Sequence, residues 1–310
     1  MNILITGGTG FVGRSLIQNL SESGQHRLYG LARSDKAAAS LQSVGVKAVI
    51  GSLDDGARLK RVLATLDLDI VIHLAAEIAS QRNKKLLHAV NVAGTQNLFE
   101  AVRELPTLKR FLFVSTVVTG EAHGQLLEEH TELNVETEYG RTKQESERML
   151  LSAFSDTGFP VVICRPCHIY GNGGWLKEIA GQIREGKARI PGAGDNLWDV
   201  VHVQDVASAL ALLMEQGQDG EIYHVADDHP VALKDFFEEV TRILGARKAG
   251  HVPRFIANWM IGKDTITSVV RSARTSNIKL KDLGWSPGYP EYKKGLTDAF
   301  SVQPIKGKIR

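Results

Sequence analysis

The sequence TGGTGFVG, at residues 6 to 13, follows an apolar run at residues 2 to 5 and precedes a segment of helical periodicity. Glycine adopts positive φ at little cost and lets a ligand come close to the backbone. A helix N-terminus offers free N–H groups and the positive end of the helix dipole to a phosphate. The stretch therefore predicts a strand-to-helix turn that holds the pyrophosphate of a dinucleotide, with a tight turn without a ligand as the alternative. The residues expected to contact the dinucleotide here are Gly7, Thr9, Gly10, Phe11, Val12 and Gly13.

Short apolar runs rich in Val and Ile alternate with longer segments of helical periodicity through the first half of the chain. These runs are apolar at both alternating sets of positions, which is typical of strands buried on both faces of a parallel sheet. The alternation predicts an α/β fold with a Rossmann-type doubly wound parallel sheet. We expect strands at residues 2–6, 27–31, 47–50, 70–74, 110–115 and 161–165, and helices at residues 13–23, 57–66, 86–105 and 139–156.

The pattern changes after Pro166, where glycine-rich loops and shorter segments replace the regular alternation. Here we expect helices at residues 175–185, 203–215 and 233–244 and a strand near 221–226. The chain of 310 residues is long enough for two cores. We therefore predict an NAD(P)-binding Rossmann domain at residues 1–166, with segments near 200–226 returning to it. A smaller, interleaved, mainly substrate-binding domain is expected at residues 167–310.

The composition is that of a folded protein with little net charge. Apolar residues make up 43% of the chain and charged residues 23%, and the formal net charge is only +2. Because the basic residues form no stripe, we expect no nucleic-acid partner, and Lys306, Lys308 and Arg310 are expected to form a solvated tail. No apolar run approaches the roughly 20 residues of a membrane-spanning helix, and Met1 leads straight into a strand. We expect a cytoplasmic protein with no membrane partner.

Cys164 and Cys167 are the only cysteines, and they form a C-x-x-C pattern that is found at redox dithiols and in zinc sites. A redox dithiol usually opens a helix, whereas Pro166 and the residues after it continue as strand and loop. A zinc site needs further thiols or a suitably spaced histidine pair. We expect two reduced thiols and no metal site.

The residues after the second expected strand bear on the type of dinucleotide. In this fold an acid about 20 residues beyond the glycines binds the ribose of NAD, whereas an arginine there accommodates the 2′-phosphate of NADP. Leu31 and Ala32 stand at the place of the acid, and Arg33 and Ser34 follow. We predict a preference for NADP(H). NAD(H) is the alternative if Arg33 is a solvated cation and Asp35 serves the ribose.

Tyr139 and Lys143 lie four residues apart in an expected helix, so their side chains emerge on the same face. A tyrosine has an ordinary pKa of roughly 10, and it exchanges a proton near neutral pH only where a cation favours the phenolate. Lys143 supplies such a cation and a donor for a ribose. We predict that this pair transfers a proton, with a solvated helix face as the alternative.

Seven further blocks follow the glycine-rich stretch in order: HLAA (73–76), NVAGTQNL (91–98), FVSTVVTG (113–120), YGRTK (139–143), RPCHIYG (165–171), HVQDVA (202–207) and LKDLGWSP (280–287). With TGGTGFVG, they resemble the extended branch of the short-chain dehydrogenase/reductase superfamily, the NAD-dependent epimerase/dehydratase family. The chain is most similar to the ketoreductase and 3β-hydroxysteroid dehydrogenase side of that family.

The resemblance implies a third catalytic group, a hydroxyl that hydrogen-bonds the substrate oxygen. Counting from the expected strand selects Thr116, whereas counting back from Gly120 selects Ser115; we favour Thr116 and keep Ser115 open. Asn91 either supports a water relay or caps its helix. Further cofactor contacts are implied for Ser52, Leu53, Ala75, Ala76, Asn91, Tyr139, Lys143, Pro166 and His168.

The resemblance also implies hydride transfer between a nicotinamide and a carbinol or carbonyl carbon, with Tyr139 moving the proton. Many members act on nucleotide-diphosphate sugars. Trp198, however, stands where those enzymes usually carry a diphosphate-binding arginine, and Val117 and Val118 stand where a dehydratase carries an acid pair. We predict an NADP(H)-dependent oxidoreductase that interconverts a ketone and a secondary alcohol on a fairly apolar small molecule. The alternatives are a nucleotide-diphosphate-sugar epimerase or dehydratase and an NADP-sensing regulator without turnover.

Large apolar residues of the second half either line an apolar substrate pocket or form the core of the smaller domain: Trp175, Leu197, Trp198, Phe255, Trp259 and Met260. Candidates for binding an anionic group on the substrate are Arg184, Arg189 and Arg274. The resemblance implies a homodimer, packed as a four-helix bundle through the helices that begin near Leu86 and Tyr139.

Overall fold

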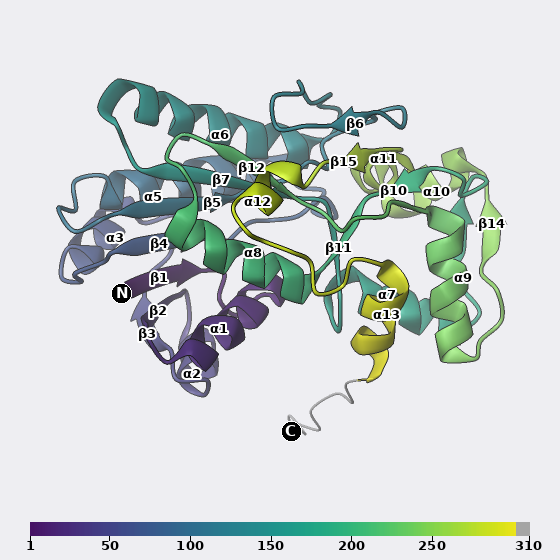
Figure 1. Ribbon diagram of the computed structural model, residues 1–310, viewed down its shortest axis with the longest axis horizontal. Coiled ribbons are helices and arrows are strands. Elements are labelled where there is room, and N and C mark those ends of the chain that lie inside the picture. Colours follow the sequence, from purple (N-terminus) through teal and green to yellow (C-terminus); the bar gives the residue numbers. More distant parts are fainter. Residues whose placement is uncertain (302–310) are drawn as a thin grey trace.

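The computed structural model describes residues 1–301, so the expected basic tail at Lys306, Lys308 and Arg310 lies outside the described residues. Seven strands form the central sheet: β1 (Asn2–Thr6), β2 (Arg27–Ala32), β3 (Lys47–Ile50), β4 (Ile70–His73), β5 (Arg110–Val114), β7 (Val161–Pro166) and β12 (Ile222–Val225). They are parallel, in the order β12-β7-β5-β4-β1-β2-β3 (Figure 1). This order confirms the predicted Rossmann-type doubly wound sheet, and the expected strand ends are correct to within one residue.

Helices cover both faces of the sheet. On one face lie α1 (Phe11–Ser23), α2 (Asp35–Gln42) and α8 (Val203–Gln216), and on the other lie α3 (Gly56–Leu63), α5 (Gly94–Val102) and α6 (Glu138–Thr157). Ile3 and Ile5 pack on the α1 side, whereas Leu4 packs on the α3 side. Successive side chains of a strand point to opposite faces, which is why these strands need apolar residues at every position.

Several helical features differ from the predictions, since no helix was expected after residue 244 and the described residues beyond it, up to Ser301, contain four. Two more differences lie in the first half. The helix α2 was not expected, because it buries only Ala38 and Leu41 and its apolar periodicity is correspondingly weak. The single helix expected at residues 86–105 is a run of three pieces, α4 (Lys84–His88), the π-helical turn η1 (Ala89–Ala93) and α5. The π-helical turn has no signature in apolar spacing, so the sequence pattern did not reveal it.

The second half adds a smaller set of elements to one side of the sheet (Figure 1). Its core includes Phe236, Leu233 and Val200, which are fully buried. None of the helices in the described residues is long and apolar enough to cross a membrane. The helices are α7 (Gly174–Arg184), α9 (Leu233–Leu244), α10 (Arg254–Ile261), α11 (Lys263–Val270), α12 (Ile278–Asp282) and α13 (Tyr292–Ser301). The paired short strands are β8 (His168–Tyr170) with β11 (Val200–His202), β9 (Arg189–Pro191) with β14 (Gly250–Val252), β10 (Leu197–Trp198) with β13 (Val231–Ala232), and β6 (Leu126–Leu127) with β15 (Arg274–Thr275).

Candidate dinucleotide and catalytic site

The glycine-rich stretch forms the turn between β1 and α1, at the point where the strand order reverses. Gly7 has a φ of 70°, and a Cβ there would lie 2.8 Å from the backbone nitrogen of Ala75. A Cβ on Gly13 would lie 2.3 Å from the carbonyl oxygen of Gly7. Gly10 is the N-cap of α1 and has no side chain with which to cap the first-turn N–H groups. The turn therefore fits a pyrophosphate at a helix N-terminus.

A buried hydrogen-bond network holds this turn. His73, at the end of β4, contacts the Thr6 hydroxyl through Nδ1 at 2.6 Å and the Thr95 hydroxyl through Nε2 at 2.9 Å. Thr6 Oγ1 also accepts from the N–H of Ala75 at 3.1 Å. Burial and the nearby charge of Lys143 lower the pKa of His73 to about 3, so the ring is neutral. The network joins β1, β4 and α5; Thr95, in the block NVAGTQNL, is a member that the sequence analysis missed.

The residues expected on the adenosine side lie at the carboxyl ends of neighbouring strands. Arg33 and Ser34 stand where β2 ends and α2 begins, and the Arg33 side chain is exposed. Ser34 caps α2 through its hydroxyl. Ser52 and Leu53 follow β3, and the Leu53 carbonyl accepts from Asn97 Nδ2 at 2.7 Å. All four residues therefore lie along the edge of the sheet at which this fold binds its ligands.

Tyr139 and Lys143 lie one turn apart on α6. Lys143 is buried, and its Nζ donates to the carbonyl oxygen of Val114 at 2.7 Å and lies 4.7 Å from the ring centre of Phe113. Burial lowers the pKa of Lys143 to about 8, against the raising effect of Glu147. Burial raises the pKa of Tyr139 to about 12, so its hydroxyl keeps a proton at neutral pH. The pair thus places a proton donor and a buried amine on one side of α6.

The two candidate hydroxyls at the end of β5 have different surroundings. Thr116 Oγ1 accepts from a backbone N–H two residues on at 2.9 Å and donates to the carbonyl oxygen of Pro166 at 3.3 Å. The Ser115 hydroxyl is buried and has no hydrogen-bond partner among residues 1–301. Ser115 stands two residues after Phe113, so its side chain points to the same sheet face, the one that carries the Lys143 amine. Backbone groups satisfy Thr116 but leave Ser115 unpaired.

Asn91 lies in the π-helical turn η1 and holds the segment that follows β4. Its Oδ1 accepts from the N–H of Glu77 at 2.8 Å, and its Nδ2 donates to the Glu77 carbonyl and to Thr142 Oγ1, both at 3.0 Å. The expectation that Asn91 caps a helix is wrong, because it stands inside the continuous helical run from α4 to α5. Its amide ties α6 to the segment that contains Ala75 and Ala76, and a water relay stays a prediction.

Pro166 ends β7 and His168 begins β8. The His168 Nδ1 and Nε2 atoms each lie 3.1 Å from a backbone carbonyl oxygen, those of Asp199 and Ser268. The ring stacks on Trp198, with ring centres 4.6 Å apart. Because backbone groups occupy both ring nitrogens, a contact with a nicotinamide would use the other ring face or the backbone of His168.

Three of the large apolar residues considered for a substrate pocket belong to the packed part of the second half. Trp175 and Trp198 both pack against Phe236, with ring centres 5.8 Å apart in each pair. Trp198 is 3% exposed, and Leu197 before it is half-buried. The core interpretation therefore holds for Trp198, whose indole Nε1 donates to a backbone carbonyl at 2.7 Å.

The other three lie on α10 and are turned to solvent. Phe255, Trp259 and Met260 are 75%, 86% and 55% exposed, so the core interpretation is wrong for them. Trp259 lines a cavity of about 250 Å³ between α10, the segment at residues 79–87 and the start of α6. The three candidate arginines for an anionic group are also exposed, and two of them donate to nearby backbone carbonyls: Arg184, Arg189 and Arg274.

Both cysteines are buried thiols. Cys164 lies on β7, Cys167 follows that strand, and neither forms a disulfide. Burial raises the pKa of both thiols, which disfavours the reactive thiolate. Within residues 1–301, no group of three His, Cys, Asp or Glu side chains is arranged to hold a metal ion. The C-x-x-C pattern therefore marks packed positions at the end of a central strand.

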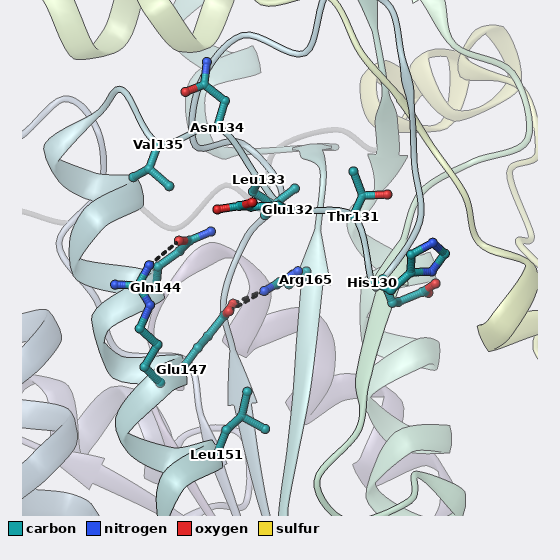
Figure 2. Close-up of a pocket in the computed structure, with 12 residues that line it drawn as sticks. His130, Thr131, Glu132, Leu133, Asn134, Val135, Gln144, Glu147, Leu151 and Arg165 are labelled. Atoms are coloured by element: carbon teal, nitrogen blue, oxygen red, sulfur yellow. Dashed lines mark hydrogen bonds and ion pairs between the residues drawn. The ribbon is translucent and has the colours of Figure 1, made fainter.

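A polar cavity of about 700 Å³ lies between α6, β7 and residues 129–135 (Figure 2). Arg165 points toward Glu147, and its Nε and Nη2 donate to the two carboxylate oxygens at 2.9 and 2.6 Å (Figure 2). Both side chains are buried. This pair fixes the carboxylate whose charge raises the pKa of Lys143, one turn away. The sequence analysis missed the pair, although Arg165 opens the block RPCHIYG and Glu147 stands four residues after Lys143.

Comparisons with known proteins agree with this geometry. The sequence profile of the NAD dependent epimerase/dehydratase family matches residues 3–226. A 4-hydroxy-2-methyl-3-oxo-4-farnesyl-3,4-dihydroquinoline-1-oxide ketoreductase of Stigmatella aurantiaca is 29% identical over 289 residues, covering 90% of this chain and 85% of that protein. The dTDP-D-glucose 4,6-dehydratase of Homo sapiens is 26% identical over 312 residues, covering 95% of this chain and 87% of that protein. The solved structure of a dTDP-glucose 4,6-dehydratase from Bacillus anthracis with NAD has the same fold, with a TM-score of 0.81 at 24% identity, covering 96% of this chain and 95% of that one.

Proposed function

Because this chain belongs to the NAD dependent epimerase/dehydratase family, we propose that it interconverts a ketone and a secondary alcohol on a fairly apolar small molecule, with NADP(H) as the preferred cofactor. Its membership makes the chain an NAD(P)-dependent oxidoreductase of the extended short-chain dehydrogenase/reductase superfamily. The observation that carries the proposal lies at the end of β5. There the buried amine of Lys143 and the unpaired hydroxyl of Ser115 share one sheet face, and protonated Tyr139 stands on the same side of α6 as Lys143.

The glycine turn and its neighbours supply the cofactor site in this proposal. The first-turn N–H groups of α1 would hold the pyrophosphate, and the backbone at Ala75 and Ala76 would lie beside it. When bound, the nicotinamide supplies or accepts the hydride. The buried network of His73 keeps the turn in one shape, so little ordering is left to occur on binding.

Tyr139 donates the proton in the reducing direction. Burial raises the pKa of Tyr139 and so keeps the phenol protonated at neutral pH. A charged Lys143, one turn away on α6, would favour the phenolate that forms. We assign to Ser115 the hydrogen bond to the substrate oxygen, in place of the Thr116 expected from the sequence, because the Thr116 hydroxyl is engaged by the backbone. In the oxidising direction the Tyr139 phenol must first lose its own proton, and the resulting phenolate then takes the proton from the alcohol.

Two observations support an apolar ketone or alcohol as the substrate. A related protein is a ketoreductase named for a substrate that carries a farnesyl group. Val117 and Val118, at the place of a dehydratase's acid pair, are buried and apolar. Dehydratase relatives at 26% identity make nucleotide-diphosphate sugars the second candidate substrate class. The homodimer stays a prediction; of the exposed large apolar side chains in residues 1–301, only Leu86 lies on α4, α5 or α6.

The first experiment measures binding of NADPH and NADH. It then follows nicotinamide absorbance with ketones and product formation with nucleotide sugars, because an epimerase or dehydratase returns the nicotinamide to its starting state. We expect NADPH to bind about 10-fold tighter, a difference of about 1.4 kcal/mol. Arg33→Ala should remove that difference by weakening NADPH alone, because the exposed guanidinium at the end of β2 would face the 2′-phosphate. Tighter binding of NADH by the unchanged protein would contradict the cofactor assignment.

Turnover of apolar ketones is expected, and Tyr139→Phe should lower kcat by about 10²- to 10⁴-fold while NADPH binding stays nearly unchanged. Tyr292→Phe, on α13, is the matched control for loss of a phenol elsewhere and should keep full activity. Turnover confined to nucleotide sugars would replace the ketone assignment with the second candidate. Binding of NADPH without hydride exchange to any substrate would favour the NADP-sensing regulator.

A further inference from the structure

The apolar side chains exposed on α10 form an uncovered surface. Phe255, Ile256, Trp259 and Met260 are 75%, 37%, 86% and 55% exposed, whereas Ala257 is buried. Phe255 and Trp259 stand four residues apart, as do Ile256 and Met260, so both pairs share one side of the helix. That side faces away from Ala257, the residue with which α10 packs on the protein. In the part of the chain that the structure describes, nothing covers it.

The chain around α10 is positively charged. Residues 245–263 contain four lysines and arginines and no Asp or Glu; Lys248 pairs with Glu238 at 2.8 Å, and Asp264 follows the segment. Arg254 is the first residue of α10 and Lys263 begins α11 just after it, and both are exposed. The exposed Arg82 adds a cation at the end of the helix, where its Nη2 donates to the Met260 carbonyl at 3.1 Å. An apolar strip edged by cations is the result.

This combination suits the boundary between headgroups and acyl chains of an anionic lipid layer. Trp and Phe are favoured at that boundary, and lysines and arginines attract the anionic headgroups. The apolar face of α10 is less suited to contact with a second copy of the chain. A stable interface buries roughly 800 Å² on each partner, more than a helix of this length presents, and a two-fold contact would bring Arg254 and Lys263 of both copies together.

The helix α10 also lies beside the candidate catalytic helix. Asp264, in the first turn of α11, accepts from the N–H of Glu138 at 2.7 Å, and Glu138 precedes Tyr139 on α6. The Thr265 hydroxyl reaches the Ala79 carbonyl at 3.4 Å. These contacts enclose the cavity of about 250 Å³ that Trp259 and Glu138 both line. A layer against α10 would therefore lie next to an opening at the start of α6.

We propose that α10 docks this protein onto the surface of an anionic lipid layer, with Phe255, Trp259 and Met260 at the headgroup boundary and Arg254 and Lys263 beside anionic headgroups. An apolar molecule held in the layer then reaches the cavity beside α6 along a short path. The contact needs no spanning helix. It replaces the expectation, made from the sequence alone, that the protein has no membrane partner.

Tryptophan fluorescence gives a direct test, because Trp259 is 86% exposed while Trp198 and Trp285 are 3% and 5% exposed. We expect a blue shift of the emission with vesicles of phosphatidylcholine and phosphatidylglycerol, and little shift with phosphatidylcholine alone. Added salt should weaken the shift, since it screens the exposed cations. Trp259→Phe should lose the shift yet still sediment with the anionic vesicles.

Sedimentation with vesicles identifies the contributing residues. The double variant Phe255→Ser with Trp259→Ser should bind at least about 10-fold more weakly, because two large apolar side chains no longer insert. Arg254→Ala with Lys263→Ala should weaken binding about 10-fold to anionic vesicles only. Val44→Ser, at a side chain 54% exposed in the other half of the molecule, is the matched control and should change nothing. Because all these side chains are exposed, the midpoint of thermal unfolding should stay the same in every variant.

Failure of the unchanged protein to sediment with anionic vesicles would overturn the proposal, as would equal sedimentation of the Phe255→Ser, Trp259→Ser variant. A dimer in gel filtration that this variant abolishes would also overturn it, because α10 would then belong to an interface between copies. The measurement uses neither cofactor nor substrate, so its outcome is separate from that of the catalytic proposal.

Discussion

The turn between β1 and α1 and the helix α10 are built in opposite ways. In the turn, backbone atoms approach so closely that a Cβ on Gly13 would lie 2.3 Å from the Gly7 carbonyl oxygen. On α10, Phe255 and Trp259 are 75% and 86% exposed and pack on little. The shape of the turn is decided by contacts inside the chain, whereas the apolar face of α10 is left open to solvent. The first region is held by its own packing, and the second is the surface that we propose docks on a lipid layer.

The sharpest test of this difference concerns single hydroxyl groups at the cofactor end. Ser115→Ala should lower kcat by about 10²- to 10³-fold with little change in cofactor binding, because an unpaired, buried donor is lost from the place where charge develops. Thr116→Val should retain most of the activity and lose stability instead, since its hydroxyl bonds two backbone groups. Steady-state kinetics and thermal unfolding separate the two. The reverse pattern would restore Thr116 as the catalytic hydroxyl.

A pair of glycines compares the two halves directly. Gly13→Ala should weaken NADPH binding by about 10-fold or more, because the new Cβ must displace the Gly7 carbonyl and so reshape the turn. Gly181→Ala, inside α7, meets no atom within 4 Å and should leave binding unchanged. It should also raise the free energy of unfolding by up to about 1 kcal/mol, the usual gain from replacing a helical glycine. Isothermal titration and chemical denaturation measure both effects; equal NADPH affinities in the two variants would remove the distinction.

Asp227 lies where the two halves meet, two residues after the end of β12. Its N–H donates to the carbonyl oxygen of Val200 on β11, in the smaller part. Burial is the main cause that raises its pKa to about 8, and Asp228 adds to the shift. Because the folded-state pKa lies above the unfolded value, the stability contributed by the protonated carboxyl is complete below about pH 4 and is lost as the pH rises toward 8.

Asp227→Asn removes this titration. At pH 7 the variant should be more stable by at least about 1 kcal/mol, since one unit of pKa corresponds to about 1.4 kcal/mol, and near pH 4 it should match the unchanged protein. Thermal unfolding across this pH range checks the sign. An advantage of the variant that did not change with pH would point to packing instead of proton binding.

Local patterns determined the parts of this protein that depend on neighbours in sequence. The continuous apolar runs of the buried strands, the glycine spacing of the first turn and the four-residue step from Tyr139 to Lys143 are local patterns that follow from backbone geometry. Such features repeat wherever the same pattern occurs, so the seven-stranded sheet followed from the sequence with strand ends correct to within one residue. The order of the sequence blocks indicated the family to which the chain belongs.

Only the tertiary structure decided what depends on residues far apart in the chain. Ser115 and Thr116 are alike as sequence, and they differ because the Pro166 carbonyl engages one hydroxyl and leaves the other unpaired. The exposure of Trp259 likewise depends on where α10 packs on the rest of the protein. The apolar pattern of a helix is the same in the sequence whether its apolar face is buried or exposed. Periodicity says which side of an element is apolar; only the packed chain shows whether that side has a neighbour.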